Sequence, residues 1–239
     1  MNLSIDLGNT YAKTGLFLGG RLVETRWKLT YDELVNYVQN VNPQRIMVSS
    51  VSSSEERLKD ELSKITTEIY LLKSTTPVPL IKRYDTPETL GADRVAAAVG
   101  AKILYPEKNC LVIDMGTCIT YDLVDAADNF HGGIISIGVR MRFKAMNTFT
   151  KRLPLLEPDG IPDLIGKNTK HAMQSGVMNG LLAEINGLIE EYDKVLTNIN
   201  VIFCGGDATY FANRIKNPNF VVPELVLIGL NRILEYNVK

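Results

Sequence analysis

Asp6 and Asp114 each belong to an acid-x-glycine turn that follows a short apolar segment. Cys110-Leu111-Val112-Ile113 predicts a buried strand, and Asp114-Met115-Gly116-Thr117 comes directly after it. A glycine lets backbone N–H groups come close to a phosphate, and the threonine hydroxyl adds a further donor. The carboxylate can hold a cation, or a water bound to a metal, beside the same phosphate. This pattern therefore predicts a phosphate-binding turn.

The turn around Asp6 repeats the one around Asp114. Ser4-Ile5-Asp6-Leu7-Gly8-Asn9-Thr10 aligns in register with Val112-Ile113-Asp114-Met115-Gly116-Thr117-Cys118. One Asp-x-Gly is weak support for a function, because it is also a common turn. Two such turns in two halves of one chain suggest a duplicated fold that holds a phosphate between the halves. Lys13, just beyond the first turn, is close enough in sequence to reach that phosphate.

A third acidic residue, Asp93, lies in Gly91-Ala92-Asp93-Arg94, which opens an Ala-rich helix predicted over residues 95–104. The helix dipole favours an ionised carboxylate at this position, and such a carboxylate can accept the proton of an attacking hydroxyl. The Arg94 guanidinium can bind a substrate carboxylate as a fork. A structural interpretation is also open, in which Asp93 only caps the helix and Arg94 is a surface charge.

The elements that position these residues follow from apolar periodicity and turn signals. In the first half, three antiparallel strands are expected, with Gly19-Gly20 as a two-residue hairpin turn. Thr30 and Glu33 form a capping box for a helix, and the order strand, helix, strand follows. The second half repeats this order. Its expected strands and helices are 111–114, 119–124, 130–135, a helix from near Val139, 169–195, 200–204, 207–215, 220–222 and 224–236.

Composition limits the classes of function. The chain has 239 residues, of which 45% are hydrophobic and 22% charged, as in an ordinary globular protein. A net charge of -1 gives no reason to expect nucleic acid or an anionic membrane as a partner. No secretory signal precedes Asp6, no apolar run is long enough to span a bilayer, and the three cysteines are widely separated. We therefore expect a cytoplasmic protein whose cysteines are buried thiols.

Two familiar nucleotide-binding motifs are excluded. No Gly-x-Gly occurs in the chain, so the dinucleotide fingerprint is absent. The segment from Gly160 to Gly166-Lys167 is one residue too long for a P-loop, and Asn168 stands where that motif needs Ser or Thr.

The duplicated strand-helix pattern with two Asp-x-Gly turns resembles the actin-like ATPase superfamily, which includes acetate and sugar kinases. The resemblance implies an α/β, duplicated actin-like (ribonuclease H-like) fold. It would have two βββαβαβ-type halves, 1–108 and 109–239, with a cleft between them.

The chain is more closely similar to the type III pantothenate kinases. Three motifs carry this resemblance: Asp6-Leu7-Gly8-Asn9-Thr10, the segment from Tyr84 to Arg94, and Asp114-Met115-Gly116-Thr117. Further segments along the whole chain also match the family pattern: Gly132-Gly133-Ile134-Ile135, Gly166-Lys167-Asn168-Thr169, Gly205-Gly206-Asp207 and Leu225-Val226-Leu227-Ile228-Gly229-Leu230. The combination is specific, although no single motif is.

The resemblance implies ATP-dependent phosphorylation of pantothenate, the first step of coenzyme A synthesis. It also implies a divalent ion with the nucleotide, expected to be Mg²⁺, a monovalent cation (K⁺ or NH₄⁺) and a homodimer. Asp93 would be the catalytic base, and Asp114 would hold the monovalent cation. The implied ATP-binding residues are Asp6, Leu7, Gly8, Asn9, Thr10, Tyr11, Ala12, Lys13 and Thr117. The implied substrate-binding residues are Tyr84, Gly91, Ala92, Asp93, Arg94 and Thr169, the last across the dimer.

The chain departs from the family pattern at Ile137, where the family usually carries a proline before Gly138. Proline fixes φ and stiffens a turn, so we expect this loop to be more mobile here. Tyr84 could also serve only in packing, and Thr169 only as the N-cap of the long helix. Two rival functions stay open: a phosphatase or polyphosphate hydrolase on the same fold, and a non-catalytic regulator, which should lack the Gly-x-Asp-Arg acid.

Overall fold

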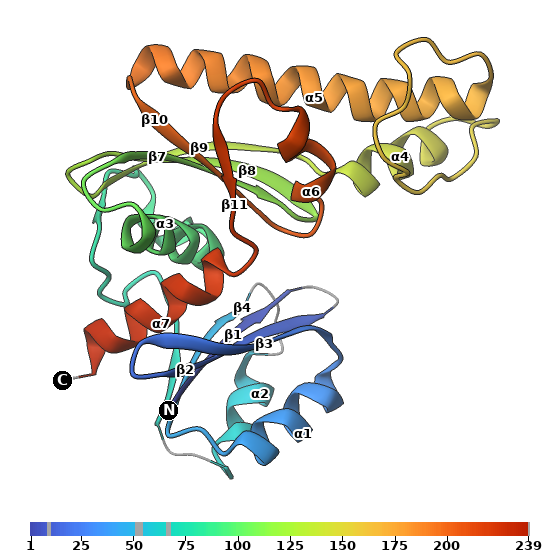
Figure 1. The fold of residues 1–239 in the computed structure, drawn as a ribbon. Helices are drawn as coiled ribbons and strands as arrows, with labels where there is room; N and C mark the ends of the chain where they lie inside the picture. The colour runs from blue at the N-terminus through green and yellow to red at the C-terminus, as the bar shows by residue number, and fades with distance from the viewer. Residues whose placement is uncertain (9–10, 51–54, 66–67, 239) are drawn as a thin grey trace. The chain divides into compact units, whose positions relative to one another are not determined.

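The computed structural model describes residues 1–8, 11–50, 55–65 and 68–238, and the chain divides into two compact units. Unit 1 contains Met1–Glu107, Ala127–His131 and Glu224–Lys239, and unit 2 contains Lys108–Ala126 and Gly132–Pro223. Figure 1 gives the labels of the helices and strands. The halves 1–108 and 109–239 that we infer from the sequence repeat stay a prediction. The two units are defined by contacts within each unit, whereas the halves are defined by duplication, so one division does not test the other.

Unit 1 is built on a five-stranded mixed sheet in the order β3-β2-β1-β4-β5. β1 runs antiparallel to β2 and parallel to β4, β2 is antiparallel to β3, and β4 is parallel to β5. The bounds of these strands are β1 Asn2–Leu7, β2 Ala12–Leu18, β3 Arg21–Leu29, β4 Arg45–Ser50 and β5 Glu68–Leu71. Gly19 and Gly20 have φ of +55° and +78°, which fits the predicted two-residue hairpin turn.

Helices α1 (Tyr31–Val41) and α2 (Glu55–Leu62) contribute to an apolar core against this sheet. Leu3 and Ile5 of β1 lie in that core, so Ser4 and Asp6 lie on the opposite face, because successive strand residues alternate. The predicted capping box is confirmed: the Thr30 hydroxyl accepts the N–H of Glu33, whose carboxylate accepts the N–H of Thr30.

Helices α3 (Ala92–Leu104) and α7 (Leu225–Asn237) pack against each other, and α7 also packs on β1 and β4. Two glycines allow the helix backbones to touch. A Cβ at Gly229 would lie 1.7 Å from the carbonyl oxygen of Ala96, and a Cβ at Gly100 would lie 2.2 Å from that of Leu225. This contact holds α3 against α7, and the first turn of α3 carries Asp93. The short η1 helix (Pro87–Thr89) precedes α3.

The second sheet has the order β11-β10-β7-β8-β9-β6. β7 runs antiparallel to β8 and parallel to β10, and β10 is parallel to β11. The bounds are β6 Ile81–Lys82, β7 Asn109–Met115, β8 Cys118–Val124, β9 Asn129–Ile137, β10 Ile199–Cys204 and β11 Asn219–Val221. The order β9-β8-β7-β10-β11 repeats β3-β2-β1-β4-β5, as the predicted duplication requires. The sequence does not predict β6, which pairs with the first residues of β9.

Three helices pack on the sheet of unit 2 through a core that includes Ile113, Phe143, Leu181, Phe203 and Phe211. The helices of this unit are α4 Val139–Thr148, α5 Thr169–Val195, α6 Ala208–Phe211 and the short η2 Ala212–Arg214. The long helix therefore has the predicted bounds. Within the described ranges, no helix combines the length and the apolar character needed to cross a membrane.

Candidate active site

The first Asp-x-Gly turn lies in the hairpin between β1 and β2. Asp6 pairs with Lys13 across the two strands, and the Lys13 Nζ lies 3.6 Å from the Asp6 Oδ2. Burial raises the pKa of Asp6, the Lys13 ammonium opposes that rise, and the negative charge of Asp93 adds to it. Asp6 and Asp93 therefore lie close enough in unit 1 for their charges to interact. Such a pair of carboxylates favours a nearby cation.

In both turns the glycine N–H closes the hairpin. Gly8 donates to the carbonyl oxygen of Tyr11 at 3.2 Å, and Gly116 donates to that of Cys118 at 3.0 Å. We expected the glycines to bring N–H groups toward a phosphate, but their own N–H groups are used in the loop. Any backbone donors to a phosphate must therefore come from other residues of each turn.

The other residues of the first turn differ in their surroundings. The side chains of Leu7 and Ala12 belong to the apolar core of unit 1, so only their backbone atoms can face a ligand. Tyr11 is half exposed. Asn9 and Thr10, which we also expect to bind ATP, lie outside the described residues.

Asp93 lies in the first turn of α3, one residue after Ala92. Its Oδ1 accepts the N–H of Arg94 at 2.9 Å, and the N-cap residue of the helix is Gly91. Asp93 is therefore not the N-cap residue, although its carboxylate accepts one N–H of the first turn. A Cβ at Gly91 would lie 2.6 Å from the Asp93 Oδ1, so glycine at this position makes room for the carboxylate.

The structure brings Arg94 and Tyr84 together. Arg94 is only 6% exposed, and its guanidinium carbon lies 5.8 Å from the centroid of the Tyr84 ring. The Tyr84 ring in turn lies 6.3 Å from that of Phe130. The interpretation of Arg94 as a surface charge is therefore wrong. A buried guanidinium stacked on an aromatic ring has a fixed direction, as an anion-binding group needs.

The second Asp-x-Gly turn lies between β7 and β8 of unit 2. Asp114 pairs with Thr120 of β8 and with Cys204 of β10. Gly205, with φ of +86°, lies against this turn: a Cβ there would lie 2.5 Å from the Asp114 Oδ1. The Gly205 backbone therefore packs directly against the Asp114 carboxylate, and a carboxylate oxygen of this kind suits a hard cation.

Thr117 is exposed at the tip of the second turn. Gly138, the N-cap of α4, lies against the backbone of this tip: a Cβ at Gly138 would lie 2.1 Å from the Thr117 carbonyl oxygen and 2.6 Å from that of Gly116. The turn is thus packed between Gly138 and Gly205. Among the described residues, no group of three or more His, Cys, Asp or Glu side chains forms a metal site.

Arg140 of α4 holds the glycine turn that follows β10, and sequence reasoning missed this contact. The Arg140 Nη1 donates to the buried Asp207 Oδ1 at 2.7 Å, and the Asp207 N–H donates to the Met115 carbonyl oxygen at 3.1 Å. This hydrogen bond to Asp207 raises the pKa of Arg140. An acid directly after Gly205-Gly206 was the available signal, but nothing in the sequence names its partner.

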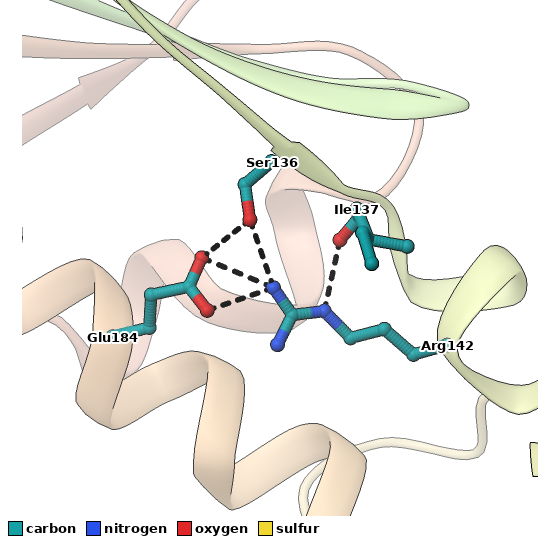
Figure 2. A network of polar contacts seen from close by, with 4 residues as sticks. All are labelled: Ser136, Ile137, Arg142 and Glu184. Carbon is teal, nitrogen blue, oxygen red and sulfur yellow. Dashed lines mark hydrogen bonds and ion pairs between the residues drawn. The ribbon is translucent and has the colours of Figure 1, made fainter. Parts of the chain in front are cut away.

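Arg142 of α4 forms a second network with the end of β9 and with α5 (Figure 2). Its Nε donates to the Ile137 carbonyl oxygen at 2.8 Å. Its Nη2 lies 3.0 Å and 2.8 Å from the two carboxylate oxygens of Glu184, and 3.1 Å from the Ser136 Oγ. Ser136 donates to Glu184 at 2.8 Å. Sequence reasoning did not single out these residues either.

Thr169 is the first residue of α5, and its side chain is exposed. The N-cap is Asn168, whose Oδ1 accepts the N–H of His171 at 2.9 Å. The interpretation of Thr169 as the N-cap is therefore wrong, and the capping function does not explain that residue.

Solved structures define the class of fold. A Campylobacter jejuni protein described as a conserved member of the Baf family of transcriptional activators aligns with a TM-score of 0.67 and 22% identity over 98% of both chains. A ROK hexokinase from Thermus thermophilus aligns with a TM-score of 0.52 and 13% identity, over 98% of this chain and 99% of that one. The fold is therefore that of the actin-like ATPases and ROK sugar kinases, as predicted.

Sequence comparison identifies the family within this class. The family model for type III pantothenate kinase matches residues 2–191. A type III pantothenate kinase from Cytophaga hutchinsonii is 45% identical over 238 residues, which cover 100% of both chains. The chain belongs to the type III pantothenate kinase family, which confirms the family and the enzyme class predicted from the sequence.

Proposed function

We propose that this protein transfers the γ-phosphate of ATP to the terminal hydroxyl of pantothenate and so forms 4'-phosphopantothenate, the first intermediate of coenzyme A synthesis. Membership of the family supports the reaction. The observation that carries the assignment to residues is the buried Arg94 guanidinium packed over the Tyr84 ring, directly after Asp93 in the chain. It supports an anion-binding group next to the residue expected to act as the base.

In unit 1, Asp93 accepts the proton of the attacking hydroxyl, since a primary alcohol is a poor nucleophile while it keeps that proton. Arg94 and Tyr84, stacked on each other, bind the pantothenate carboxylate and the adjacent chain. Gly91 and Ala92 contact the same substrate through their backbone. The turn from Asp6 to Lys13 binds the ATP phosphates, with Lys13 supplying positive charge.

Phosphoryl transfer needs positioning and charge neutralisation more than covalent help. Mg²⁺ bound with ATP would supply part of that neutralisation. Asp6 would hold the ion through water, because Mg²⁺ loses its waters reluctantly. In unit 2, Thr117 binds ATP, and Asp114 would hold a monovalent cation, potassium or ammonium.

The protein acts as a homodimer in which Thr169 of one copy contacts the substrate of the other. Exposed apolar side chains just before α5, Leu164 and Ile165, support an interface there. Gly176 and Gly180 of α5 add a face open enough for a second helix to approach. Cys110 and Cys204 are buried thiols, as expected, whereas Cys118 is exposed, so the expectation of a buried thiol is wrong for Cys118. Three cysteines without a disulfide fit the reducing cytoplasm in which we place the enzyme.

The direct test is ATP consumption by the purified protein with and without pantothenate. We expect turnover to depend on pantothenate, with one ADP released for each pantothenate phosphorylated. Equal ATP or polyphosphate hydrolysis without pantothenate would support the hydrolase instead. Absence of turnover under both conditions, with ATP still bound, would support the non-catalytic regulator.

A further inference from the structure

We propose that Arg142 and Glu184 are positioning residues that hold the second phosphate turn, Asp114–Thr117, in the shape that binds ATP. The inference rests on the proposed function, since it needs Thr117 to bind ATP. Neither residue touches the turn directly. Each acts through a chain of contacts that runs from α5 through α4 to Gly138, entirely within unit 2.

The first link of this chain is the contact between Glu184 and Arg142 (Figure 2). Glu184 receives hydrogen bonds from the Arg142 Nη2 and from the Ser136 hydroxyl. The two charged side chains are 21% and 30% exposed, so solvent competes with this contact only in part. Charge-assisted hydrogen bonds that share one planar guanidinium fix its direction as well as its position.

The second link joins Arg142 to the backbone before α4. The Nε of the guanidinium that Glu184 holds donates to the Ile137 carbonyl oxygen at 2.8 Å. That carbonyl and the Gly138 N–H belong to one planar peptide group. Fixing the carbonyl therefore fixes the orientation of the peptide that leads into Gly138.

The third link is the contact of Gly138 with the turn. A Cβ at Gly138 would lie 2.1 Å from the Thr117 carbonyl oxygen, so the backbones of Gly138 and Thr117 touch without space for adjustment. A rotation of the Ile137–Gly138 peptide would therefore displace Thr117. Packed contacts transmit such a shift because they leave no room to absorb it.

The chemistry of Arg142 makes the network specific. A lysine carries the charge but cannot present the separate Nε and Nη2 donors that reach Ile137, Ser136 and Glu184 from one rigid plane. Arg142→Lys should therefore lose most of the positioning, although it keeps the positive charge. Glu184→Gln should disturb the positioning less than Arg142→Lys does, because one acceptor oxygen remains.

The experiment measures KM for Mg-ATP, KM for pantothenate, kcat and thermal stability for Arg142→Lys and Glu184→Gln. We expect kcat/KM for ATP to fall by roughly 10-fold to 10²-fold, in line with the effect of a small misplacement of a binding group, while KM for pantothenate stays unchanged. The matched control is Glu191→Gln, which removes an exposed charge pair with Lys194 on the same helix and should change neither value. If Arg142→Lys does not fold, Glu184→Gln and Ser136→Ala provide the same comparison.

Thr117→Ala, alone and combined with Glu184→Gln, decides between the possible outcomes. If the network acts through the turn, the double variant should lose less than the product of the two single effects. Fully multiplicative effects, or lower stability with an unchanged KM for ATP, would overturn the positioning role. An unchanged KM for ATP in Thr117→Ala would overturn the ATP role of the turn, and the inference with it. If Thr117→Ala is impaired but the Arg142 and Glu184 variants are not, only the inference fails.

Discussion

At the scale of single residues, Asp6 lies in surroundings that disfavour its charged form. Burial and the charge of Asp93 both raise its pKa, and Lys13 offsets this only in part. A carboxyl group whose pKa is raised by its surroundings is typical of a site that binds a cation or a reactant. The ligand, when bound, supplies the missing positive charge.

The first prediction concerns Asp6→Asn. Because the folded state raises the pKa of Asp6 above its ordinary value of 3.8, the folded protein binds this proton more tightly than the unfolded chain does. Stability from this group therefore falls as pH rises through the window between 3.8 and the raised pKa. Asp6→Asn cannot ionise, so it avoids this loss of stability. Its Tm at neutral pH should therefore equal or exceed that of the wild type, and the difference between the two Tm values should shrink at acid pH.

The same variant should lower kcat/KM for Mg-ATP by roughly 10²-fold, since an electrostatic contact with the reacting groups is lost. Asp32→Asn, at an exposed position in α1, is the control and should change neither quantity. A variant with reduced Tm at neutral pH and normal turnover would mean that Asp6 is only a turn former.

The second prediction concerns Asp114 and the monovalent cation. A cation beside the phosphates offsets their charge without competing for the Mg²⁺ position. Activity should rise steeply when potassium replaces sodium or Tris, and Asp114→Asn should lose this response. Full activity of the wild type in buffer free of potassium and ammonium would contradict the site.

Individual residues were also where sequence reasoning failed. Asp93 and Thr169 were both plausible caps, yet the cap positions belong to Gly91 and Asn168. An error of one or two residues at a helix start is invisible to propensity, because several neighbours are acceptable caps. The contacts of Arg140 with Asp207 and of Arg142 with Glu184 were not predictable either, since these partners lie 67 and 42 residues away in sequence.

At the scale of helices and strands, apolar periodicity was enough to predict most of the fold. The long helix has the predicted bounds, and the strand order in the second sheet repeats that in the first. β6 was not predicted, because a strand of two residues is too short to show an alternation of apolar and polar residues. Whether Ile137 makes its loop more mobile than a proline would stays a prediction, although Arg142 now gives that segment a partner.

The third prediction concerns the contact between α3 and α7. Gly229→Ala would place a methyl group 1.7 Å from the Ala96 carbonyl oxygen, so the two helices must separate. We expect the free energy of unfolding to fall by about 1–3 kcal/mol, as is typical of overpacking. For a chain of this size, this lowers Tm by roughly 2–4 °C per kcal/mol in thermal denaturation.

Gly187→Ala in α5 is the matched control for this helix variant. A Cβ at Gly187 meets nothing within 4 Å, so alanine should be neutral or stabilise the helix by up to about 1 kcal/mol. If the two variants had equal Tm values, the glycine contact would not constrain α3.

At the scale of the whole molecule, two features matter for the proposed reaction: the duplication, which gives the chain two Asp-x-Gly turns, and the proposed dimer, in which one copy would contact the substrate of the other. Both Asp-x-Gly turns follow the central strand of the repeated five-strand order, β1 or β7, and lead into a hairpin. This repetition was predictable because the two motifs align in the sequence. The dimer was suggested only by the family resemblance, since a monomer sequence does not distinguish an apolar interface from an apolar core.

The fourth prediction tests that dimer. If Thr169 of one copy serves the substrate site of the other, inactive Asp93→Asn and inactive Thr169→Val proteins should regain activity when mixed. Random exchange makes half of the dimers mixed, and each has one intact site of two, so roughly a quarter of wild-type activity should return. No recovery, with exchange confirmed by differently tagged subunits, would place both residues in one chain's site.

The last prediction tests Asp93, on which the proposed mechanism depends most directly, through the turnover and Mg-ATP affinity of Asp93→Asn. Asparagine keeps the oxygen that accepts the Arg94 N–H, so Tm should hardly change, while the proton acceptor is lost. We predict that kcat falls by about 10²-fold to 10⁴-fold and that calorimetry finds Mg-ATP binding nearly unchanged. A variant that loses stability but keeps its turnover would contradict the account, because Asp93 would then serve the helix and not the reaction.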